Sequence, residues 1–511
     1  MTPEFSAVAT FVHFSALGAL SLYGLHRIWL LANWWLQRGS APQPFTSLPE
    51  NLPLVTVQLP VFNERFVAQR LLDAVAGLDW PVDRLEIQVL DDSSDDTSDI
   101  VAQRVAYWQG RGIHISHILR SQRSGFKAGA LAAGLKSASG EFVAIFDADF
   151  IPAADFLLKT IPQFHDPRVG MVQTRWVFCN TEHSWLTGVQ ALLLGPHFSI
   201  EHQVRFRKGL FFNFNGTAGI WRRQAIADAG GWQSDTVTED LDLSYRAQLA
   251  GWRFVYLDGY EVPSELPVTL AAFRSQQQRW AKGSVQTARK ILPQLLSRDL
   301  PFAVKCEALT HLLANICWLL GTVIFLTLYP TIVYRIGVGP WQMMRLDLPL
   351  FVATSCAIMS YFFVYLTVNR GNGSFRRFLL LPVVSIGLAP SISLAVLRGL
   401  WSRGGFFERT PKFGITGKST LPRHAFLYRQ KGLPYLLLNA LLFLYSLLPL
   451  TFALQRGTWY ALPLFFLFPV GFLAVIVQEI HELRAGFLAS PAVPFSQPFS
   501  QPVSHSEISE T

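Results

Sequence analysis

The chain has 511 residues, of which half are apolar and only 15% are charged, and its net charge is +8. A chain of this length exceeds one ordinary domain, and this composition argues against a wholly soluble protein. Because the basic residues concentrate beside apolar segments, they indicate contact with anionic lipid headgroups rather than binding to nucleic acid.

The first predicted element is a membrane-spanning helix at residues 5–26. These 22 residues contain no Asp, Glu, Lys or Arg, and they are long enough to cross a bilayer core of about 30 Å. A cleavable secretory signal normally has a basic residue ahead of its apolar run, but here Arg27 and Arg38 follow it. By the positive-inside rule, the N-terminus is expected outside and the following domain in the cytosol.

Residues 52–300 contain no comparable apolar window and are predicted to form a soluble domain. Strands are expected at 54–60, 85–90 and 142–146, and the segment 64–78 between the first two has the apolar spacing of a helix. Strands that alternate with helices indicate parallel pairing in a layered α/β domain. In such sheets, ligands bind beyond the carboxyl ends of the strands.

Two pairs of carboxylates follow predicted strands. Asp91 and Asp92 end the second strand, and Asp147 and Asp149 end the third in the stretch "EFVAIFDADF". One such pair alone would more simply be a turn or a helix cap, but two pairs in one α/β domain favour a binding site. The D-x-D spacing suits Mg²⁺ or a similar hard cation that is bridged to a diphosphate.

Three further stretches carry candidate site residues. "RSGFKAGAL" brings Arg123 and Lys127, which fit contacts with phosphate, although the absence of G-x-x-x-x-G-K-[ST] excludes a P-loop nucleotide hydrolase. Glu239 and Asp240 open a predicted amphipathic helix, where acidic residues could equally be complements of the helix dipole. "FRSQQQRWAKG" is either a solvated helix face or a site that places an arginine on phosphate and an indole on a sugar.

Five more apolar windows follow the domain. The segment 369–377 between two of them has three basic residues and no acid, and 398–431 has eight against one. If 378–397 crossed the membrane, one of these loops would lie outside, against the positive-inside rule, and Pro382 and Pro390 would interrupt the span. We therefore expect five spans and one interfacial or re-entrant segment at 378–397, with six spans as the alternative. The windows are 308–334, 348–369, 378–397, 432–455 and 457–478.

Four motifs in this order resemble the signature of processive family-2 glycosyltransferases, the group of cellulose synthase. The similarity spans roughly residues 52–300 and is strongest to plant cellulose synthase-like mannan and glucomannan synthases (CslA-like) and to xyloglucan-backbone glucan synthases (CslC-like). The stretches "LPVFNER", "IQVLDDS", "AIFDADF", "FNFNGTAGIWR" and "FRSQQQRW" carry it. The motif residues are Asp92; Asp147 and Asp149; Thr238, Glu239 and Asp240; and Gln276, Arg279 and Trp280.

The resemblance implies a Rossmann-like GT-A α/β domain in the cytosol and an inverting, metal-dependent hexosyltransferase. Asp240, next to Glu239, would be the general base that takes the proton from an acceptor hydroxyl. Asp147 and Asp149 would hold Mg²⁺ or Mn²⁺ on the donor diphosphate, and Arg279 would stabilise the departing diphosphate.

The resemblance also implies residues that bind the donor or the acceptor. Trp280 would stack near the acceptor end. A gating loop with the family pattern F-x-V-T-x-K is similar to "FGITGK", in which Phe413, Ile415, Thr416 and Lys418 match with Ile for Val. The binding residues implied in this way are Asp92, Lys127, Asp147, Asp149, Gln276, Arg279, Trp280, Thr416 and Lys418.

The function expected from the resemblance is synthesis of a β-glycan, a β-1,4-mannan, glucomannan or glucan, from GDP-mannose or UDP-glucose. The alternatives are a glycolipid synthase, which would glycosylate a lipid acceptor in the bilayer, and a non-enzymatic lipid or glycan transporter. The protein is expected in a plasma or inner membrane, or in the Golgi membrane of a eukaryote. The motifs contact the diphosphate, so they leave the sugar open.

Six segments are expected along the chain. An N-terminal transmembrane helix with its basic flank precedes the cytosolic GT-A domain, and two transmembrane helices follow that domain. An interfacial segment with a basic gating-type loop, two further transmembrane helices and a disordered tail complete the chain. The boundaries are 1–40, 41–300, 301–370, 371–432, 433–480 and 481–511.

Overall fold

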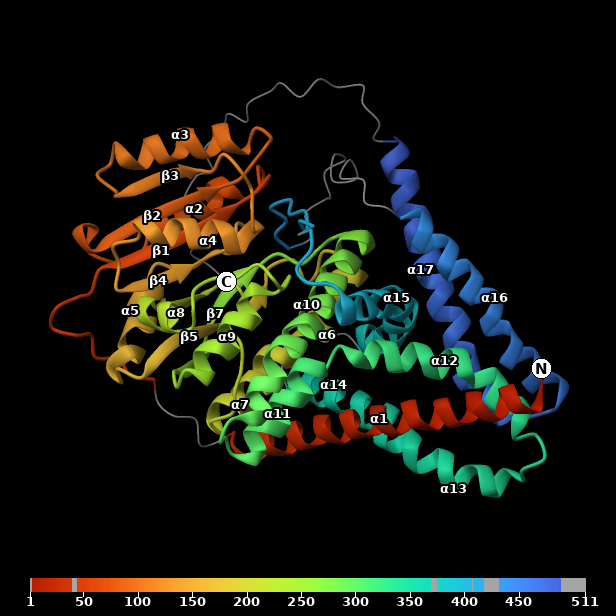
Figure 1. Cartoon of the computed structure of the whole chain (residues 1–511). Coiled ribbons are helices and arrows are strands. Elements are labelled where there is room, and N and C mark those ends of the chain that lie inside the picture. The colour runs from red at the N-terminus through yellow and green to blue at the C-terminus, as the bar shows by residue number, and fades with distance from the viewer. Residues whose placement is uncertain (1, 39–43, 369–374, 407, 418–431, 489–511) are drawn as a thin grey trace.

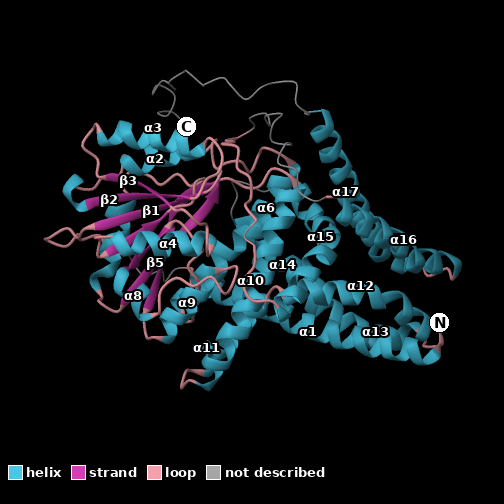
Figure 2. Cartoon of the chain, turned by 45° about the horizontal axis from the view of Figure 1, so that its top comes forward, coloured by secondary structure: helices cyan, strands magenta, loops and turns pink. Residues whose placement is uncertain are grey.

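The computed structural model describes the whole chain except residues 1, 39–43, 369–374, 407, 418–431 and 489–511. An α/β domain lies at one end, and long helices extend from it to the other end (Figure 1). Figure 2 shows the strands as one layer with helices on both of its faces.

The described part of the α/β domain contains one sheet of seven strands in the order β3-β2-β1-β4-β6-β5-β7. Strands β3, β2, β1 and β4 are mutually parallel, β6 runs antiparallel to both of its neighbours, and β5 is parallel to β7. The layered α/β domain and the parallel pairing of the three predicted strands, β1, β2 and β4, are confirmed, although the complete sheet is mixed. The strands are β1 (Val55–Val61), β2 (Leu85–Asp91), β3 (Ile115–Leu119), β4 (Phe142–Ile145), β5 (Val169–Phe178), β6 (Gly219–Arg222) and β7 (Arg253–Ser264).

The helices of this domain cover both faces of the sheet and continue toward the membrane helices. Helices α2 and α3 pack on one face, and α4, α8 and α9 pack on the other. The helices are α2 (Ala68–Ala76), α3 (Thr97–Gln109), α4 (Phe126–Ser137), α5 (Phe156–Thr160), α6 (Trp185–Pro196), α7 (His202–Arg207), α8 (Arg223–Asp228), α9 (Glu239–Leu249), α10 (Leu270–Ser297) and α11 (Phe302–Leu313).

Strand β4 illustrates why the sequence folds into a sheet that is buried on both faces. Phe142 and Ala144 belong to the apolar cluster under α2 and α3, whereas Val143 and Ile145 belong to the cluster under α4 and α9. Successive side chains point to opposite faces, so a continuous apolar run fits a strand covered on both sides. The run ends at Phe146, and the chain becomes acidic where it leaves the sheet.

The order of the parallel strands reverses between β1 and β4. From β1 the chain continues to β2 and then to β3 on one side, and it returns to β4 on the other side. At such a reversal, the loops that follow the two adjacent strands diverge and leave a crevice at their carboxyl ends. Asp147 and Asp149 follow β4 at this point.

Six helices in the described part of the chain are long and apolar enough to cross a membrane, and each contains most of one apolar window of the sequence. One of the six consists of two helices, α13 and α14, that are joined by a π-helical turn, Val352–Cys356. The long helices are α1 (Pro3–Leu36), α12 (Ile316–Tyr334), α13 (Pro340–Phe351) with α14 (Ala357–Val368), α15 (Phe375–Trp401), α16 (Leu433–Gln455) and α17 (Leu462–Leu488).

One helix start and two connections between long helices lie at the end of the molecule farthest from the sheet. The start of α1, the connection between α12 and α13, and the connection between α16 and α17 lie there in both views (Figures 1 and 2). These helices therefore run between the α/β domain and a common distal end.

Helix α15 differs from the other five. It is one continuous helix through Pro382 and Pro390, so the expectation that these prolines would interrupt it is wrong. In Figure 1 it is seen nearly along its axis, whereas α1 and α12 lie across the view. Of its most apolar window 61% is buried, against 17 to 33% in the other five, because α6, α10, α12 and α17 pack around it.

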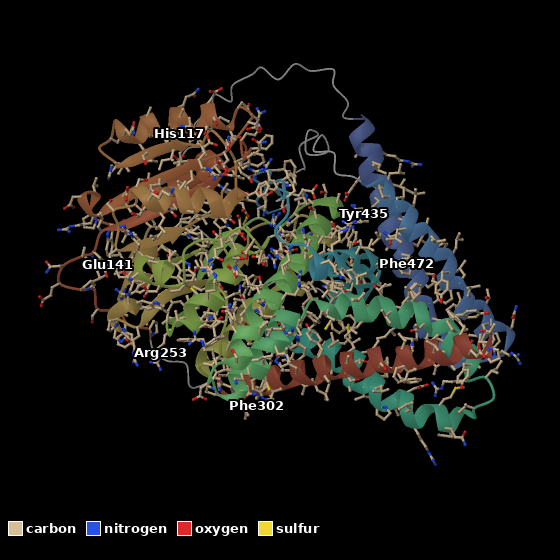
Figure 3. The ribbon with its side chains drawn as sticks, viewed as in Figure 1. His117, Glu141, Arg253, Phe302, Tyr435 and Phe472 are labelled. Carbon is tan, nitrogen blue, oxygen red and sulfur yellow. The ribbon has the colours of Figure 1, made fainter. Side chains whose placement is uncertain are left out.

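Helix α10 joins the two parts of the molecule. One side packs against α9 and α11, and another packs against α15. The hydroxyl of Tyr435 at the start of α16 donates to Oε1 of Gln278 on α10 at 3.3 Å, and Figure 3 shows Tyr435 at the end of α16 that is near the α/β domain. The motif Q-x-x-R-W thus lies on a helix that packs against both the α/β domain and the long helices.

Candidate active site

A cavity of about 160 Å³ opens at the carboxyl ends of β1, β2 and β4. Nine of the eleven predicted site residues line it. Thr416 is exposed outside the cavity, and Lys418 lies outside the described residues. The nine are Asp92, Lys127, Asp147, Asp149, Glu239, Asp240, Gln276, Arg279 and Trp280.

Asp147 is paired with a lysine from the neighbouring helix. Lys127 lies in the first turn of α4, where its Nζ is 2.5 Å from Oδ1 of Asp147 and donates to the carbonyl oxygen of Gly216 at 2.9 Å. Burial lowers the pKa of Lys127, but Asp147 and Glu239 outweigh this effect and raise it above its ordinary value. Lys127 therefore remains a cation between the two acidic motifs.

Asp149 is paired with a lysine that is distant in the sequence. The Nζ of Lys412 lies 2.7 Å from Oδ2 of Asp149 and also donates to the carbonyl oxygen of Glu265. The backbone N–H of Glu265 donates to the same Oδ2 at 3.1 Å. Both Asp149 and Lys412 are buried, with 7% and 8% of their surface exposed.

The segment that carries Lys412 is fixed over the cavity at several points. Arg409 makes two hydrogen bonds to the carboxylate of Glu64, at 3.0 and 2.9 Å, and the carbonyl oxygen of Glu408 accepts from Arg279 at 2.9 Å. Burial raises the pKa of Glu64 to about 7, although Arg409 acts in the opposite direction.

Glu265 holds the residues that follow Lys412. Its carboxylate accepts backbone N–H groups from Phe413 at 2.9 Å, from Gly414 at 2.8 Å and from Ile415 at 3.2 Å. Phe413 and Ile415 in turn form a small apolar cluster with Val268. Two residues of the "FGITGK" pattern are thus packed beside the cavity.

Sequence reasoning missed four of these residues: Glu64, Glu265, Arg409 and Lys412. For Arg409 and Lys412, the signal in the sequence is the density of basic residues in 398–431. This density indicates on which side of the membrane the segment lies, but it does not indicate the partner of an individual residue. Nothing local to Glu265 distinguishes it in the sequence from a surface carboxylate.

Glu239 and Asp240 open α9 as predicted, with Thr238 at the N-cap position. Oδ1 of Asp240 accepts the backbone N–H of Leu241 at 2.8 Å. Oδ2 lies beside Gly216, since a Cβ added there would be only 2.8 Å from it. Gly216 also has φ of +85°, a conformation that favours glycine.

The two adjacent carboxylates of α9 are stronger bases than ordinary carboxylates. Burial and the neighbouring Asp240 raise the pKa of Glu239 to about 7. Burial also raises the pKa of Asp240, although Lys127 opposes this. A carboxylate with a raised pKa that faces a cavity is suited to accept a proton near neutral pH.

Asp92 and Asp91 have different environments although they are adjacent. Asp92 lines the cavity and accepts two hydrogen bonds from Arg120, one of them at 2.8 Å. Asp91 is buried, and its carboxylate accepts from Ser98 at 2.6 Å and contacts His117 at 2.9 Å. Hydrogen bonds outweigh the effect of burial and lower the pKa of Asp91 to about 2, which fits a structural anchor.

The two D-x-D carboxylates fit a hard divalent cation. Within the described ranges, no group of three or more His, Cys, Asp or Glu residues could hold a metal ion by itself. A cation at Asp147 and Asp149 would therefore complete its shell with water and with phosphate from a ligand, which is typical of Mg²⁺ sites.

Residues 142–368 match a family model described as glycosyl transferase family group 2. The matched segment is less than half of the chain, and it resembles a family 2 glycosyltransferase domain. The resemblance and the GT-A α/β fold expected from the sequence are confirmed.

Curated relatives of the chain include two plant enzymes. It is 46% identical over 250 residues to glucomannan 4-beta-mannosyltransferase 9 of Arabidopsis thaliana, which is 48% of this chain and 47% of that protein. It is 48% identical over 251 residues to glucomannan 4-beta-mannosyltransferase 2 of the same plant, with the same coverage. The match spans about half the length of these relatives.

A solved structure also matches the chain. It is a mannosyltransferase from Pyrobaculum calidifontis in complex with GDP-mannose and Mn²⁺, with a TM-score of 0.49 and 20% sequence identity. The match covers 78% of this chain and 99% of that one.

Proposed function

We propose that this protein is a glycosyltransferase that transfers mannose from GDP-mannose to the non-reducing end of a growing β-1,4-mannan or glucomannan. The observation that carries the proposal is the convergence of Asp147, Asp149 and Asp240 on one cavity with Lys127 and Arg279. The names of the curated relatives support mannose and a β-linked polymer.

The proposed roles follow from the positions of the side chains. Asp240 takes the proton from the acceptor hydroxyl as its oxygen attacks the anomeric carbon, and one displacement inverts the configuration there. Asp147 and Asp149 hold Mg²⁺ or Mn²⁺, which when bound neutralises charge on the diphosphate. Lys127 and Arg279 place two more cations at the same cavity, where they stabilise the departing diphosphate.

The remaining lining residues bind the two substrates in this proposal. Asp92, together with Arg120, contacts the nucleotide, and Gln276 and Trp280 lie toward the acceptor. The indole of Trp280 offers a flat apolar face of the kind on which sugar rings stack.

The proposal is tested with the purified full-length chain and a panel of nucleotide sugars that includes GDP-mannose and UDP-glucose. We expect release of GDP from GDP-mannose in the presence of Mg²⁺ or Mn²⁺, and a labelled product that grows to a chain. Release of UDP from UDP-glucose would show that the donor is UDP-glucose and not GDP-mannose. A single-sugar lipid product would instead support the glycolipid synthase, and no nucleotide release would support the transporter.

The dependence of the reaction on pH provides a second test. Because the base must be deprotonated, kcat/KM is expected to fall as the pH is lowered through the pKa of the carboxylate pair. Burial raises the pKa of Asp240, so this decrease is expected above the ordinary range of about 4 for carboxylic acids. Glu239→Gln removes a neighbouring negative charge, so the decrease should move to lower pH by about one unit. Profiles that coincide for the two proteins would contradict this pairing.

We also propose that five helices cross the membrane and that α15 lies along its cytosolic surface. The two basic segments that flank α15, its position across the other helices and the common distal end of α1, α12 and α16 support this arrangement. In a cysteine-free background, Arg376→Cys and Arg403→Cys should both react with an impermeant maleimide from the cytosolic side only. Labelling of the two positions from opposite sides would show that α15 spans.

A further inference from the structure

The D-x-D carboxylates are each paired with a lysine in the ligand-free protein. Lys127 contacts Asp147, and Lys412 contacts Asp149. Lys127 is local to the domain, but Lys412 comes from the segment that follows α15. A metal ion that binds Asp149 must therefore displace a buried ammonium group that already contacts this carboxylate.

The backbone around Lys412 is fixed on both sides. Before it, Arg409 is bound to Glu64 by two hydrogen bonds. After it, the N–H groups of Phe413 and Gly414 are bound to Glu265. A change in the contact of Lys412 therefore requires rotation of its four-carbon side chain and no displacement of the segment.

Electrostatics make the ammonium group and a divalent cation incompatible on Asp149. Nζ of Lys412 lies 2.7 Å from Oδ2 of Asp149, so a cation about 2 Å from the same oxygen would lie within about 5 Å of Nζ. At this separation the repulsion is strong in a site that excludes most water. A displaced ammonium group without a new partner would in turn be a buried, uncompensated charge.

A diphosphate resolves this conflict because it supplies anionic oxygens for both cations. Arg279 and Lys127 line the same cavity as Lys412, so a diphosphate bound there would lie close to three positively charged side chains. The ammonium group could then leave Asp149 for a phosphate oxygen while the metal takes its place.

We propose, on the basis of the function proposed above, that Lys412 occupies the metal position on Asp149 until a nucleoside diphosphate binds, and then transfers to the diphosphate. Metal and donor consequently bind as a pair, and the metal alone binds weakly. Lys412 is thus both a counter-ion of the empty site and a ligand of the filled site.

The test uses the full-length chain in detergent and measures two affinities for each protein. Mn²⁺ alone is titrated by electron paramagnetic resonance, and GDP at saturating Mn²⁺ is titrated by calorimetry. For Lys412→Met we expect Mn²⁺ alone to bind about tenfold more tightly and GDP with Mn²⁺ to bind about tenfold more weakly. A general loss of structure would weaken both, so the opposite signs are the diagnostic result.

Three further proteins make the result decisive. Lys412→Arg keeps the charge and should stay near the native protein in both titrations, and Lys159→Met removes an exposed lysine and should change neither. Asp149→Ala should bind no Mn²⁺ at this site. The exchange is overturned if Lys412→Met binds Mn²⁺ alone no more tightly than the native protein. If the native protein binds no Mn²⁺ even with GDP, the metal dependence in the proposed function fails as well.

Discussion

Asp240→Asn is expected to lower kcat by about 10³-fold, within the range that general base catalysis contributes. Asn has nearly the same shape, and its side-chain oxygen can still accept the N–H of Leu241, as Oδ1 does in the native protein. The substitution removes the ability to accept a proton and one negative charge near Lys127 and Arg279, and it leaves the D-x-D carboxylates unchanged. Binding of GDP-mannose should therefore stay within about twofold of the native value, as measured by titration in the presence of Mn²⁺.

Glu239→Gln is the matched control for this prediction. Glu239 is adjacent to Asp240 and is also buried at the cavity, but the proposed mechanism gives it no proton transfer. We expect its kcat to decrease less than tenfold at the optimal pH. Equal losses in the two variants, or loss of donor binding in Asp240→Asn, would contradict the assignment of the base to Asp240.

The predicted site residues that line the cavity share a local signal. Asp147 and Asp149 follow an apolar run, and Glu239 and Asp240 open an amphipathic helix, so each pair is visible within about ten residues of sequence. Loops at the carboxyl ends of adjacent parallel strands converge by topology, which is why separate local signals combine into one site. The resemblance supplied Gln276, Arg279 and Trp280, for which local patterns left two interpretations open.

The contacts made by Lys412 and Arg409 have no such signal. Lys412 is separated from Asp149 by the whole second half of the α/β domain and by three of the long helices, α12, α13 with α14, and α15. Its contact depends on how α15 and the following segment return over the cavity, which is a property of tertiary packing. The charge count assigned this basic segment to one side of the membrane but carried no information about individual partners.

Helix α15 shows a different kind of error, because the local rule that proline interrupts a helix does not hold there. Proline removes a backbone donor and usually bends or breaks a helix in water. In a helix that is enclosed by others, neighbouring groups can compensate for the lost bond. Close packing by α10 and α17 holds α15 continuous through both prolines.

Asp149→Ala is expected to abolish the dependence of donor binding on the metal. In the native protein, Mn²⁺ should raise the affinity for GDP-mannose by about 100-fold relative to EDTA, because a divalent cation stabilises the diphosphate by several kcal/mol. The variant lacks one of the two carboxylates that fit the cation, so its affinities with Mn²⁺ and with EDTA should coincide. Calorimetric titration under both conditions measures the difference directly.

The same substitution also frees Lys412, which distinguishes Asp149 from a merely structural carboxylate. Without Asp149, the ammonium group retains a hydrogen bond to the carbonyl oxygen of Glu265 and the attraction of the Glu265 and Glu64 carboxylates, and it becomes available to a phosphate oxygen. Metal-independent binding of GDP-mannose should then equal or slightly exceed that of the native protein in EDTA, and the second substitution Lys412→Met should remove it. If Asp149→Ala binds the donor tightly and still responds to Mn²⁺, the metal must be held elsewhere and the role of the D-x-D pair is wrong.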